Sequence, residues 1–475
     1  MHEQNRPGEA MPTNESKEWA GATALAIDGR AGSSHAEPSS FEIALEHQLA
    51  GRWDAAEGLY RAMLAADPGH AEALHFFGVL RHQQGHEDEG RALVEQSLAL
   101  QPHRPDWHNT WGNMLSAQGS SEEAVAAFMA ALELDARHIH AWNNLGAVLL
   151  TLGHAQDAIA ALRNAVELDP SFRAAHQNLG DAWRQAGDAH AAALCYCAEY
   201  VLRPAEERRR DILGIAYSQL GRHEEAAQVY TAWLVDEPGH PIASHLLAAS
   251  RGHAPLDRAS SEYLQTYFDA YADTFENKLV GDLEYGIPAL VGDMLAALQT
   301  PAHSLRILDA GCGTGLCGPE LRPFARQLEG VDLSTKSLVV AKEKGVYNNL
   351  HSRDIVEYLT ACAPASWDVL VAADVLIYFG SLVPFTTAAH AALASRGSLL
   401  ASFEVKDETA AGESETSMES GYVLQPSGRY SHRKDYLLRT LQERGFTVRE
   451  MKSLAIRKEL GRPVQGLLLM ATRTA

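Results

Sequence analysis

The sequence predicts two structural classes in one chain, an all-α solenoid over residues 37–253 and an α/β domain over residues 263–475. Six consecutive blocks of 34 residues fill positions 37–240 without an insertion, which predicts a helical repeat array. From residue 304 onward, apolar strand-like runs alternate with helical stretches, which predicts a mostly parallel sheet covered on both faces. A chain of 475 residues is also too long for one ordinary core.

Composition narrows the class of protein. Apolar residues make up 46% and charged residues 21% of the chain, as in globular proteins. A formal charge of −21 argues against general affinity for nucleic acid or anionic membrane, whose phosphates the surface would repel. Five cysteines without metal-ligand spacing predict no zinc site and indicate a reduced, cytoplasmic protein. Residues 1–36 show no periodicity and no signal-peptide core, so we expect a disordered segment.

The blocks share features that predict paired helices. Positions 8 and 20 hold small residues where the two helices of a repeat are expected to cross, and position 24 is bulky and expected to fill the groove between neighbouring repeats. Position 32 is proline in five of six blocks, which ends the second helix. A glycine suited to positive φ ends the first helix of every block, at Gly51, Gly85, Gly119, Gly153, Gly187 and Gly221. Residues 241–252 are expected to form a closing helix.

This pattern resembles the tetratricopeptide repeat (TPR) family, with the best copy at residues 141–170. The resemblance implies a solenoid whose concave groove binds a protein or an extended peptide. Polar residues at repeat position 5 are candidates for bonding a peptide backbone, or are polar only because the groove is wet. They are His75, Asn109, Asn143, Gln177 and Asp211.

The second half begins with a predicted linker over residues 254–262 and an aromatic helical stretch over 262–279, followed by a helix at 286–299. Strands are then predicted at 304–310, 328–334, 348–354, 367–374, 398–405, 447–456 and 464–473. Helices are predicted between them at 316–327, 335–345, 355–362, 381–397 and 433–446. The last two strands are joined only by residues 459–463, so an antiparallel strand closes a sheet of seven.

The stretch ILDAGCGTG, residues 307–315, follows the first predicted strand. Its three glycines permit a tight turn and leave room for a ligand against the backbone. Asp332 follows at the end of the next strand, about 20 residues on, an offset typical of an acid that binds ribose hydroxyls. These facts admit a dinucleotide or S-adenosylmethionine. The G-x-G-x-G spacing and the carboxylate of Asp309 beside the loop disfavour a pyrophosphate, so a nicotinamide enzyme is the weaker alternative.

Together with YFDAYADTFENKLV, ADVLIYFG and SGRYSHRKDYL, these features resemble the class I S-adenosylmethionine-dependent methyltransferases, and among them the bacterial predicted methyltransferases that carry TPR repeats. The resemblance implies a Rossmann-like fold, S-adenosylmethionine as cofactor, and methyl transfer to an unidentified small-molecule or protein acceptor. It implies cofactor contacts by Asp309, Gly311, Gly313, Gly315, Asp332, Leu333, Asp354, Ile355 and Asp374. For Asp354 and Asp374, capping of a helix N-terminus is the alternative.

Substrate contacts are expected from the aromatic helix and from an insert at residues 406–436. The candidates are Tyr267, Tyr271, Tyr422, Arg429 and Tyr430, with His432 as candidate general base. The alternative is that the tyrosines pack in a core and the insert is a solvated loop. The competing hypothesis for the whole chain is an interaction protein whose methyltransferase-like domain is a non-catalytic cofactor-binding or structural module.

Overall fold

The computed structural model describes residues 38–252, 257–276, 285–405 and 420–474. The chain divides into two compact units, residues 1–187 and 188–475, which are described separately. The segment predicted to be disordered, 1–36, lies outside the described residues.

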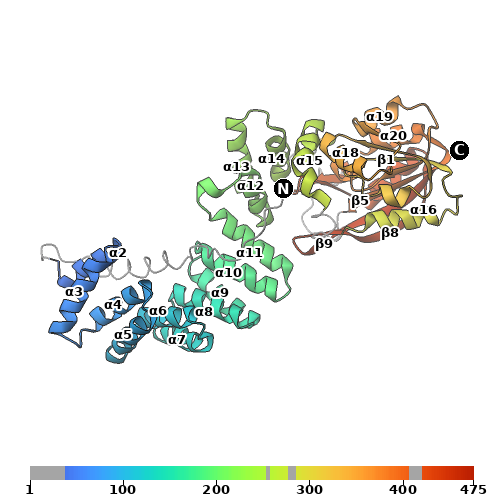
Figure 1. Cartoon of the computed structure of the whole chain (residues 1–475). Helices are drawn as coiled ribbons and strands as arrows, with labels where there is room; N and C mark the ends of the chain where they lie inside the picture. The colour runs from blue at the N-terminus through green and yellow to red at the C-terminus, as the bar shows by residue number, and fades with distance from the viewer. Residues whose placement is uncertain (1–37, 253–256, 277–284, 406–419, 475) are drawn as a thin grey trace. The chain divides into compact units, whose positions relative to one another are not determined.

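The first unit consists of helix pairs that follow one another along the chain (Figure 1). Each predicted repeat contributes two helices, and the fifth repeat contributes its first helix to this unit. The helices are α2 (Ser40–Leu49), α3 (Trp53–Ala66), α4 (Ala71–Gln83), α5 (Glu87–Leu100), α6 (Pro105–Ala117), α7 (Ser121–Leu134), α8 (Ile139–Thr151), α9 (Ala155–Leu168) and α10 (Arg173–Gln185). The prediction of a helical solenoid is confirmed.

Glycines set both the turns and the helix spacing of the repeats. The six glycines that end the first helices have positive φ, between 71° and 86°, as predicted. At position 8, a Cβ added to Gly112 would lie 2.5 Å from the Phe128 ring, and one added to Gly146 would lie 2.4 Å from Leu162. The bulky residue at position 24 therefore packs on the first helix of its own repeat. The prediction that the position-24 residue fills the groove between neighbouring repeats did not include this contact with the position-8 glycine of the same repeat.

The second unit begins with the remaining repeat helices. They are α11 (Ala189–Val201), the short η1 (Ala205–Glu207), α12 (Arg210–Gln219), α13 (His223–Asp236) and the closing helix α14 (Pro241–Arg251). These helices contact the α/β part directly. The His245 ring stacks on Tyr263 with a centroid distance of 3.9 Å, and His190 Nδ1 lies 3.0 Å from the Leu460 carbonyl oxygen.

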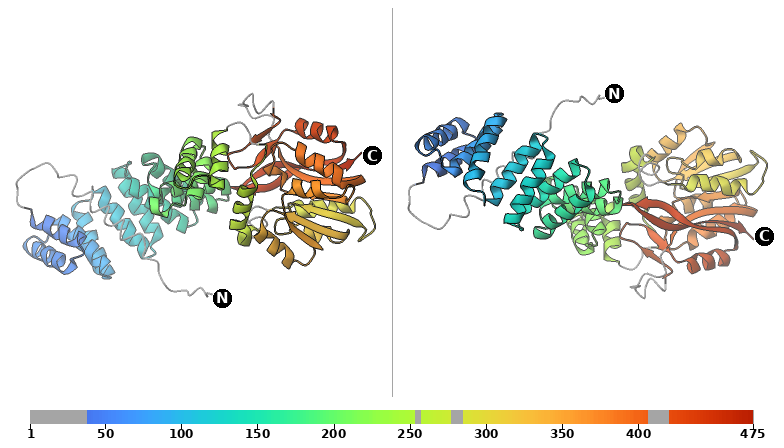
Figure 2. Two further views of the ribbon diagram at one scale, coloured as in Figure 1. Left: turned by 90° about the horizontal axis from the view of Figure 1, so that it is seen from above. Right: turned by 90° about the horizontal axis from the view of Figure 1, so that it is seen from below.

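The described residues of the α/β part form one sheet of nine strands. The strands are β1 (Leu305–Ala310), β2 (Ala325–Asp332), β3 (Asn349–Ser352), β4 (Trp367–Ala372), β5 (Leu393–Val405), β6 (Tyr422–Leu424), β7 (Tyr430–His432), β8 (Phe446–Glu459) and β9 (Arg462–Arg473). The parallel order β3-β2-β1-β4-β5 is continued on one edge of β5 by the antiparallel β9, which pairs with β8. In the right-hand view of Figure 2, β8 and β9 form a long ribbon.

Two strands are additional to the seven predicted. β7 pairs with β5 at Glu404 and Val405, where β9 already occupies the other edge of β5. It therefore lies beyond the last residue of β4, Ala372, which pairs with Ala401. This places the β6–β7 hairpin, part of the predicted insert, at the carboxyl end of the sheet.

Helices cover both faces of the sheet, because successive residues of a strand point to opposite sides. Leu308 packs with one apolar cluster, which includes α20 and α22, and Ile307 with the other, which includes α16. The covering helices are α15 (Ser261–Glu276), α16 (Ile287–Ala296), α17 (Gly318–Leu321), α18 (Thr335–Glu343), α19 (Ile355–Ala361), α20 (Val383–Ala392) and α22 (Lys434–Glu443).

Two predicted helices are shorter than expected. The helix predicted over 316–327 is only the single turn α17, since Pro323 has no N–H to continue it and Ala325 already begins β2. The helix predicted to end at Gly397 ends at Ala392. There the apolar run Leu393–Val405 continues directly as β5.

The predicted linker contributes to the α/β part where it is described. The N–H groups of Gly380 and Ser381 donate to the Asp257 carbonyl oxygen, at 2.9 and 2.8 Å. The N–H of Ala259 donates to the Tyr378 carbonyl oxygen at 2.9 Å. Residues 257–259 are therefore held beside the segment that follows β4.

Candidate functional site

A cavity of about 360 Å³ lies at the carboxyl ends of β1, β2 and β4. Open parallel sheets bind ligands at this edge. The sheet contributes polar residues at the strand ends, and α15 and the segment after β4 contribute aromatic ones. Among the lining residues are Asp309, Gly311, Gly313, Asp332, Leu333, Asp354, Ile355, Ala373, Asp374, Arg429 and Arg457.

The glycine bend after β1 shapes the cavity floor. Gly311 has φ of 78°, and a Cβ there would lie 2.4 Å from the Val375 side chain. Gly313 has φ of 51°, and a Cβ there would meet nothing within 4 Å. The bend therefore leaves open space above Gly313, which a ligand can occupy.

Asp332 is tied to this bend by backbone hydrogen bonds. Its Oδ2 accepts from the Gly313 N–H at 2.9 Å, and its Oδ1 accepts from the Ser334 N–H at 2.8 Å. Burial raises the pKa of the carboxyl, and the two N–H groups offset part of that rise. Each oxygen keeps a second lone pair with which to accept a ligand hydroxyl.

Asp309 is the most deeply buried acid of the site, with 2% exposure. Burial raises its pKa to about 7, against the hydrogen bond that Tyr347 Oη donates to Oδ2 at 2.6 Å. The negative charge of Asp332 raises it further. The carboxylates of the buried Asp309 and the half-buried Asp332 make this end of the cavity attractive to a cation and repulsive to a phosphate.

Asp354 serves two purposes at the end of β3. Its Oδ1 accepts from the N–H groups of Val356 and Glu357, at 2.9 and 3.1 Å, so it caps α19 as the structural alternative predicted. Its Oδ2 accepts from Arg258. Burial opposes the charge of Asp354, but the Arg258 hydrogen bond and the capped N–H groups outweigh burial and lower its pKa.

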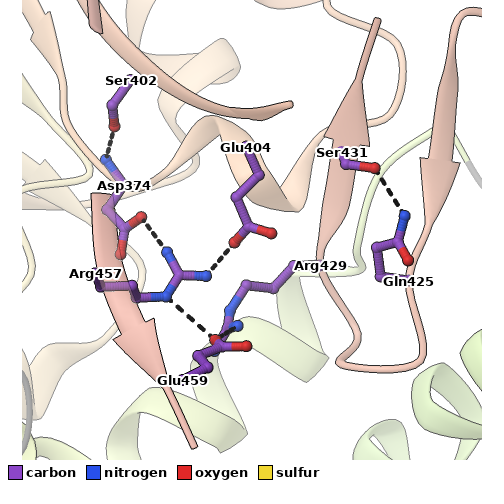
Figure 3. A network of polar contacts seen from close by, with 8 residues as sticks. All are labelled: Asp374, Ser402, Glu404, Gln425, Arg429, Ser431, Arg457 and Glu459. Atoms are coloured by element: carbon purple, nitrogen blue, oxygen red, sulfur yellow. Dashed lines mark hydrogen bonds and ion pairs between the residues drawn. The ribbon is translucent and has the colours of Figure 1, made fainter. Parts of the chain in front are cut away.

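Asp374 belongs to a network of ions at the end of β4 (Figure 3). It does not cap a helix. Instead Arg457 Nη1 donates to its Oδ1 at 3.0 Å, while Ser402 Oγ accepts from its backbone N–H at 2.7 Å. Arg457, 2% exposed, also pairs with Glu404 and Glu459, and Arg429 pairs with Glu459. The network contains three carboxylates and two guanidiniums.

Aromatic side chains form the remaining wall. Helix α15 contributes Tyr267 and Phe268, and the segment after β4 contributes Tyr378 and Phe379. The rings of Phe268 and Tyr378 meet edge to face with a centroid distance of 5.6 Å. Tyr285 completes this wall. The cavity is thus acidic at β1 and β2, aromatic along α15, and ionic at β4.

Family models match both halves of the chain. Tetratricopeptide repeat models match residues 48–110, 110–138, 139–172 and 211–242, and a methyltransferase domain model matches residues 308–401. The chain carries tetratricopeptide repeats and a methyltransferase domain.

Relatives match the methyltransferase domain over short stretches. Human methyltransferase-like protein 27 is 43% identical over 86 residues, 18% of this chain and 35% of that protein. A ubiquinone biosynthesis O-methyltransferase of Paracidovorax citrulli is 34% identical over 80 residues, 16% of this chain and 34% of that protein. The chain thus spans about a third of the length of these curated relatives.

Solved structures resemble each half separately. The crystal structure of MamA is 22% identical and covers 34% of this chain and 94% of its own, with a TM-score of 0.32. Magnesium protoporphyrin IX methyltransferase from Synechocystis, with bound SAM, is 20% identical and covers 47% of this chain and 100% of its own, with a TM-score of 0.34.

Most predicted cofactor contacts of the methyltransferase domain line the cavity, but Gly315 does not. A Cβ on Gly315 would lie 3.0 Å from the Tyr347 ring, so this glycine makes room for the tyrosine that bonds Asp309. Tyr267 and Arg429 line the cavity among the predicted substrate contacts. The side chain of Tyr271 lies outside the described part of the chain.

The other predicted substrate residues are placed in the protein core. Tyr422 Oη lies 3.1 Å from Asp257 Oδ1, and Tyr430 is fully buried. His432 is also fully buried, its Nε2 lies 3.1 Å from the Gly380 carbonyl oxygen, and burial lowers its pKa to about 4. None of the three lines the cavity. The structure thus gives no support to His432 as a base, and the described end of the insert is a hairpin rather than a solvated loop.

The residues that sequence reasoning missed support the site from distant parts of the chain. Tyr347, Arg258 and Arg457 each hold one of the cavity carboxylates. None of the three has a local signal in the sequence, because each reaches its carboxylate only through the tertiary fold.

The polar residues at repeat position 5 pack between repeats in the first unit. Asn109 Oδ1 accepts from Asn144 at 3.2 Å, and Asn143 Oδ1 accepts from Asn178 at 3.0 Å. The His75 ring stacks on Trp107 with a centroid distance of 4.6 Å. Asn109, Asn143 and His75 are at most 4% exposed, so these three are not available to a peptide backbone.

No described helix combines the length and apolarity of a membrane span. Within the same residues, no group of three or more His, Cys, Asp or Glu side chains is arranged to hold a metal ion.

Proposed function

We propose that the chain is a cytoplasmic, class I S-adenosylmethionine-dependent methyltransferase that acts on a small-molecule or protein acceptor. The observation that carries this proposal is the pair of carboxylates, the buried Asp309 and the half-buried Asp332, that line the cavity together with Gly313. S-adenosylmethionine brings a sulfonium and an ammonium, which two carboxylates attract, whereas NAD brings a pyrophosphate, which they repel.

The described residues fit the parts of this cofactor. We propose that Asp309 accepts from the ammonium group and that the free lone pairs of Asp332 accept from ribose hydroxyls. Leu333 and Ile355 supply apolar surface for the adenine, beside Asp354. Asp374 and Ala373 lie at the neighbouring strand end, where the methyl group would face the acceptor.

The sulfonium supplies a methyl carbon that is already activated for displacement. The task of the protein is therefore to align the acceptor in line with that carbon and to exclude water. The aromatic wall of Tyr267, Phe268 and Tyr378 is suited to both tasks. We assign no general base, because a base is needed only when the acceptor arrives protonated.

We further propose that the tetratricopeptide repeats bind a protein or an extended peptide that brings the enzyme to its site of action. Because Asn109 and Asn143 are buried, the half-buried Asn113 and Asn144, on the first helices of their repeats, are the candidates for this contact instead. Asn144 already donates to Asn113 at 2.9 Å, so a peptide would have to share this pair.

Calorimetry with S-adenosylhomocysteine and with NAD tests the proposal. We expect the homocysteine nucleoside to bind and NAD not to bind. Gly313→Arg should abolish binding, because the new side chain would occupy the open space of the cavity. Gly119→Arg is the matched control, since Gly119 also has positive φ and nothing within 4 Å but lies in the repeats. Binding of neither nucleoside would favour the non-catalytic alternative. If S-adenosylhomocysteine binds, transfer of a labelled methyl group from S-adenosylmethionine into lysate fractions separated by size identifies the class of acceptor.

A further inference from the structure

Arg429 is positioned by a tight and well-supported turn between β6 and β7. The Gln425 N–H donates to the Arg429 carbonyl oxygen at 2.7 Å, and the Gly428 N–H donates to the Gln425 carbonyl oxygen at 2.8 Å. Gly428 has φ of 80°, which favours glycine. Gln425 Nε2 also donates to Ser431 Oγ at 2.8 Å, which ties the two strands together (Figure 3).

The closing helix of the repeats supports this turn from behind. His245 Nε2 lies 2.8 Å from the Gly428 carbonyl oxygen. A Cβ on Gly428 would lie 3.1 Å from Leu246 and 3.2 Å from the Tyr263 hydroxyl. The turn that precedes Arg429 is therefore packed against α14 and α15, and it holds the arginine beside the cavity at low entropic cost.

Arg429 differs from Arg457, the other arginine of the ionic network, in its remaining hydrogen-bond capacity. Arg457 uses all three of its nitrogens, on Asp374, Glu404 and Glu459. Arg429 is bonded through one nitrogen, Nη1, to Glu459. A guanidinium carries five N–H donors and is always charged, so Arg429 offers further donors to a ligand in the cavity.

The order of the strands separates this guanidinium from the cofactor end. Asp309, Asp332 and Asp354 lie at the carboxyl ends of β1, β2 and β3, whereas Arg429 precedes β7, which pairs with β5 beyond the end of β4. Asp374, at the end of β4, lies between the two groups. A nucleoside over β1 to β3 therefore leaves the space over β4 and β7, between Arg429 and the aromatic wall, for the acceptor.

We propose that the methyl acceptor carries a carboxylate beside a planar, apolar body, and that Arg429 binds this carboxylate while Tyr267 and Tyr378 flank the body. The inference rests on the proposed function, because it assigns the acceptor end of that site. The network behind Arg429 already holds one more carboxylate than guanidinium, so a singly charged anion is favoured over a doubly charged phosphate.

Binding of simple probes to the full chain, saturated with S-adenosylhomocysteine, tests the inference. The probes are benzoate and phenylacetate, their amides, and benzylamine. We expect each acid to bind at least about tenfold more tightly than its amide, because a charge-assisted hydrogen bond contributes about 1.5–3 kcal/mol. Arg429→Gln should abolish this preference, Arg429→Lys should restore part of it, and Arg433→Gln should leave it unchanged. Arg433 is a matched control because it pairs with Asp435 and does not line the cavity.

Several outcomes overturn the inference. Equal binding of acids and amides, no measurable binding of the acids, or a preference for benzylamine each contradicts a carboxylate site. So does an equal loss of S-adenosylhomocysteine affinity in Arg429→Gln, which would show that Arg429 holds the carboxylate of the cofactor. If the chain binds no S-adenosylhomocysteine, the proposed function fails by itself. The affinities of the acids and amides are then measured on the chain without nucleoside. A preference for the acids that Arg429→Gln abolishes still supports the carboxylate site, and a preference that persists in this variant contradicts it.

Discussion

At the scale of single residues, the two acids of the glycine bend differ in how their charges are offset. Asp332 accepts from two backbone N–H groups, which the fold itself provides. Asp309 accepts instead from the Tyr347 hydroxyl, which belongs to a side chain from a different part of the chain. The charge of Asp309 is therefore the more sensitive to mutation and to pH.

Tyr347→Phe should weaken binding of S-adenosylhomocysteine near neutral pH. Without the hydroxyl, the pKa of Asp309 rises further, so less of the acid carries the charge that attracts the ammonium group. A lost hydrogen bond to a charged group costs about 1.5–3 kcal/mol, so we expect about a tenfold or larger loss by calorimetry. Tyr358→Phe is the matched control, since that hydroxyl bonds Glu329, outside the cavity. Equal losses in both variants would contradict the assigned role of Tyr347.

Binding of S-adenosylhomocysteine should also depend on pH through Asp309. Its pKa is raised to about 7, so the acid is protonated below that pH and ionised above it. The ammonium group of the ligand stays charged through this range. Affinity should therefore fall by about tenfold per pH unit as the pH drops below about 7. Asp309→Asn should bind weakly with no such slope, and a slope that persists in this variant would assign the titration to another group.

Sequence reasoning found the residues that lie within short chain motifs. Asp309, Gly311, Gly313 and Asp332 follow the ends of two adjacent strands, and neighbouring parallel strands bring such ends together. Tyr347 and Arg457 reach the cavity only through the tertiary fold, so no local pattern indicates where their side chains lie. His432, the candidate general base, is fully buried, and no local pattern in the sequence indicates that burial.

At the scale of elements, periodic patterns were predicted well and irregular ones were not. The repeat helices could be predicted because the 34-residue pattern occurs six times, so an atypical residue in one block does not change the helix assignment that the other blocks support. The β6–β7 hairpin occurs once and has strands of three residues each. Such strands are too short for an alternating pattern, and their stability comes from pairing with β5.

The packing of glycine against the bulky residue of its repeat gives an element-scale prediction. Gly146→Ala should lower the free energy of unfolding of the α8–α9 pair by about 1–3 kcal/mol, because its Cβ would lie 2.4 Å from Leu162. Leu162→Ala alone should cost about 2–5 kcal/mol. Combined, the two should cost less than their sum, since the new methyl group occupies part of the cavity.

Hydrogen exchange of the α8 and α9 amides measures these local free energies. The control is Gly58→Ala, where a Cβ meets nothing within 4 Å inside helix α3. That substitution should stabilise its helix by about 0.5–1 kcal/mol. Strictly additive costs for Gly146→Ala and Leu162→Ala would contradict direct packing between the two positions.

At the scale of the whole molecule, the compact units do not follow the two predicted fold classes. The second unit starts at Asp188 and joins the last repeat helices to the methyltransferase domain. Its internal contacts include His245 with Gly428 and His190 with Leu460. The sequence predicts a division near residue 253, because periodicity reports the type of an element and not the partner against which it packs. That division remains a prediction.

Two fragments test where the catalytic unit begins. A fragment of residues 188–475 should fold and bind S-adenosylhomocysteine with the affinity of the full chain, because it keeps the contacts of His245 with Gly428 and of His190 with Leu460. A fragment of residues 263–475 loses α14, which covers the Tyr263 ring, and loses residues 257–259, which bond the segment after β4. Uncovering one aromatic ring and leaving buried backbone groups unpaired should together cost about 3 kcal/mol or more. The shorter fragment should therefore unfold at a lower temperature and bind the nucleoside more weakly, because Tyr378 and Phe379 line the cavity next to the lost contacts.

Equal stability and equal affinity of the two fragments would show instead that the last repeats are separable from the enzyme, and that the support of Arg429 by His245 is not needed for the cofactor site.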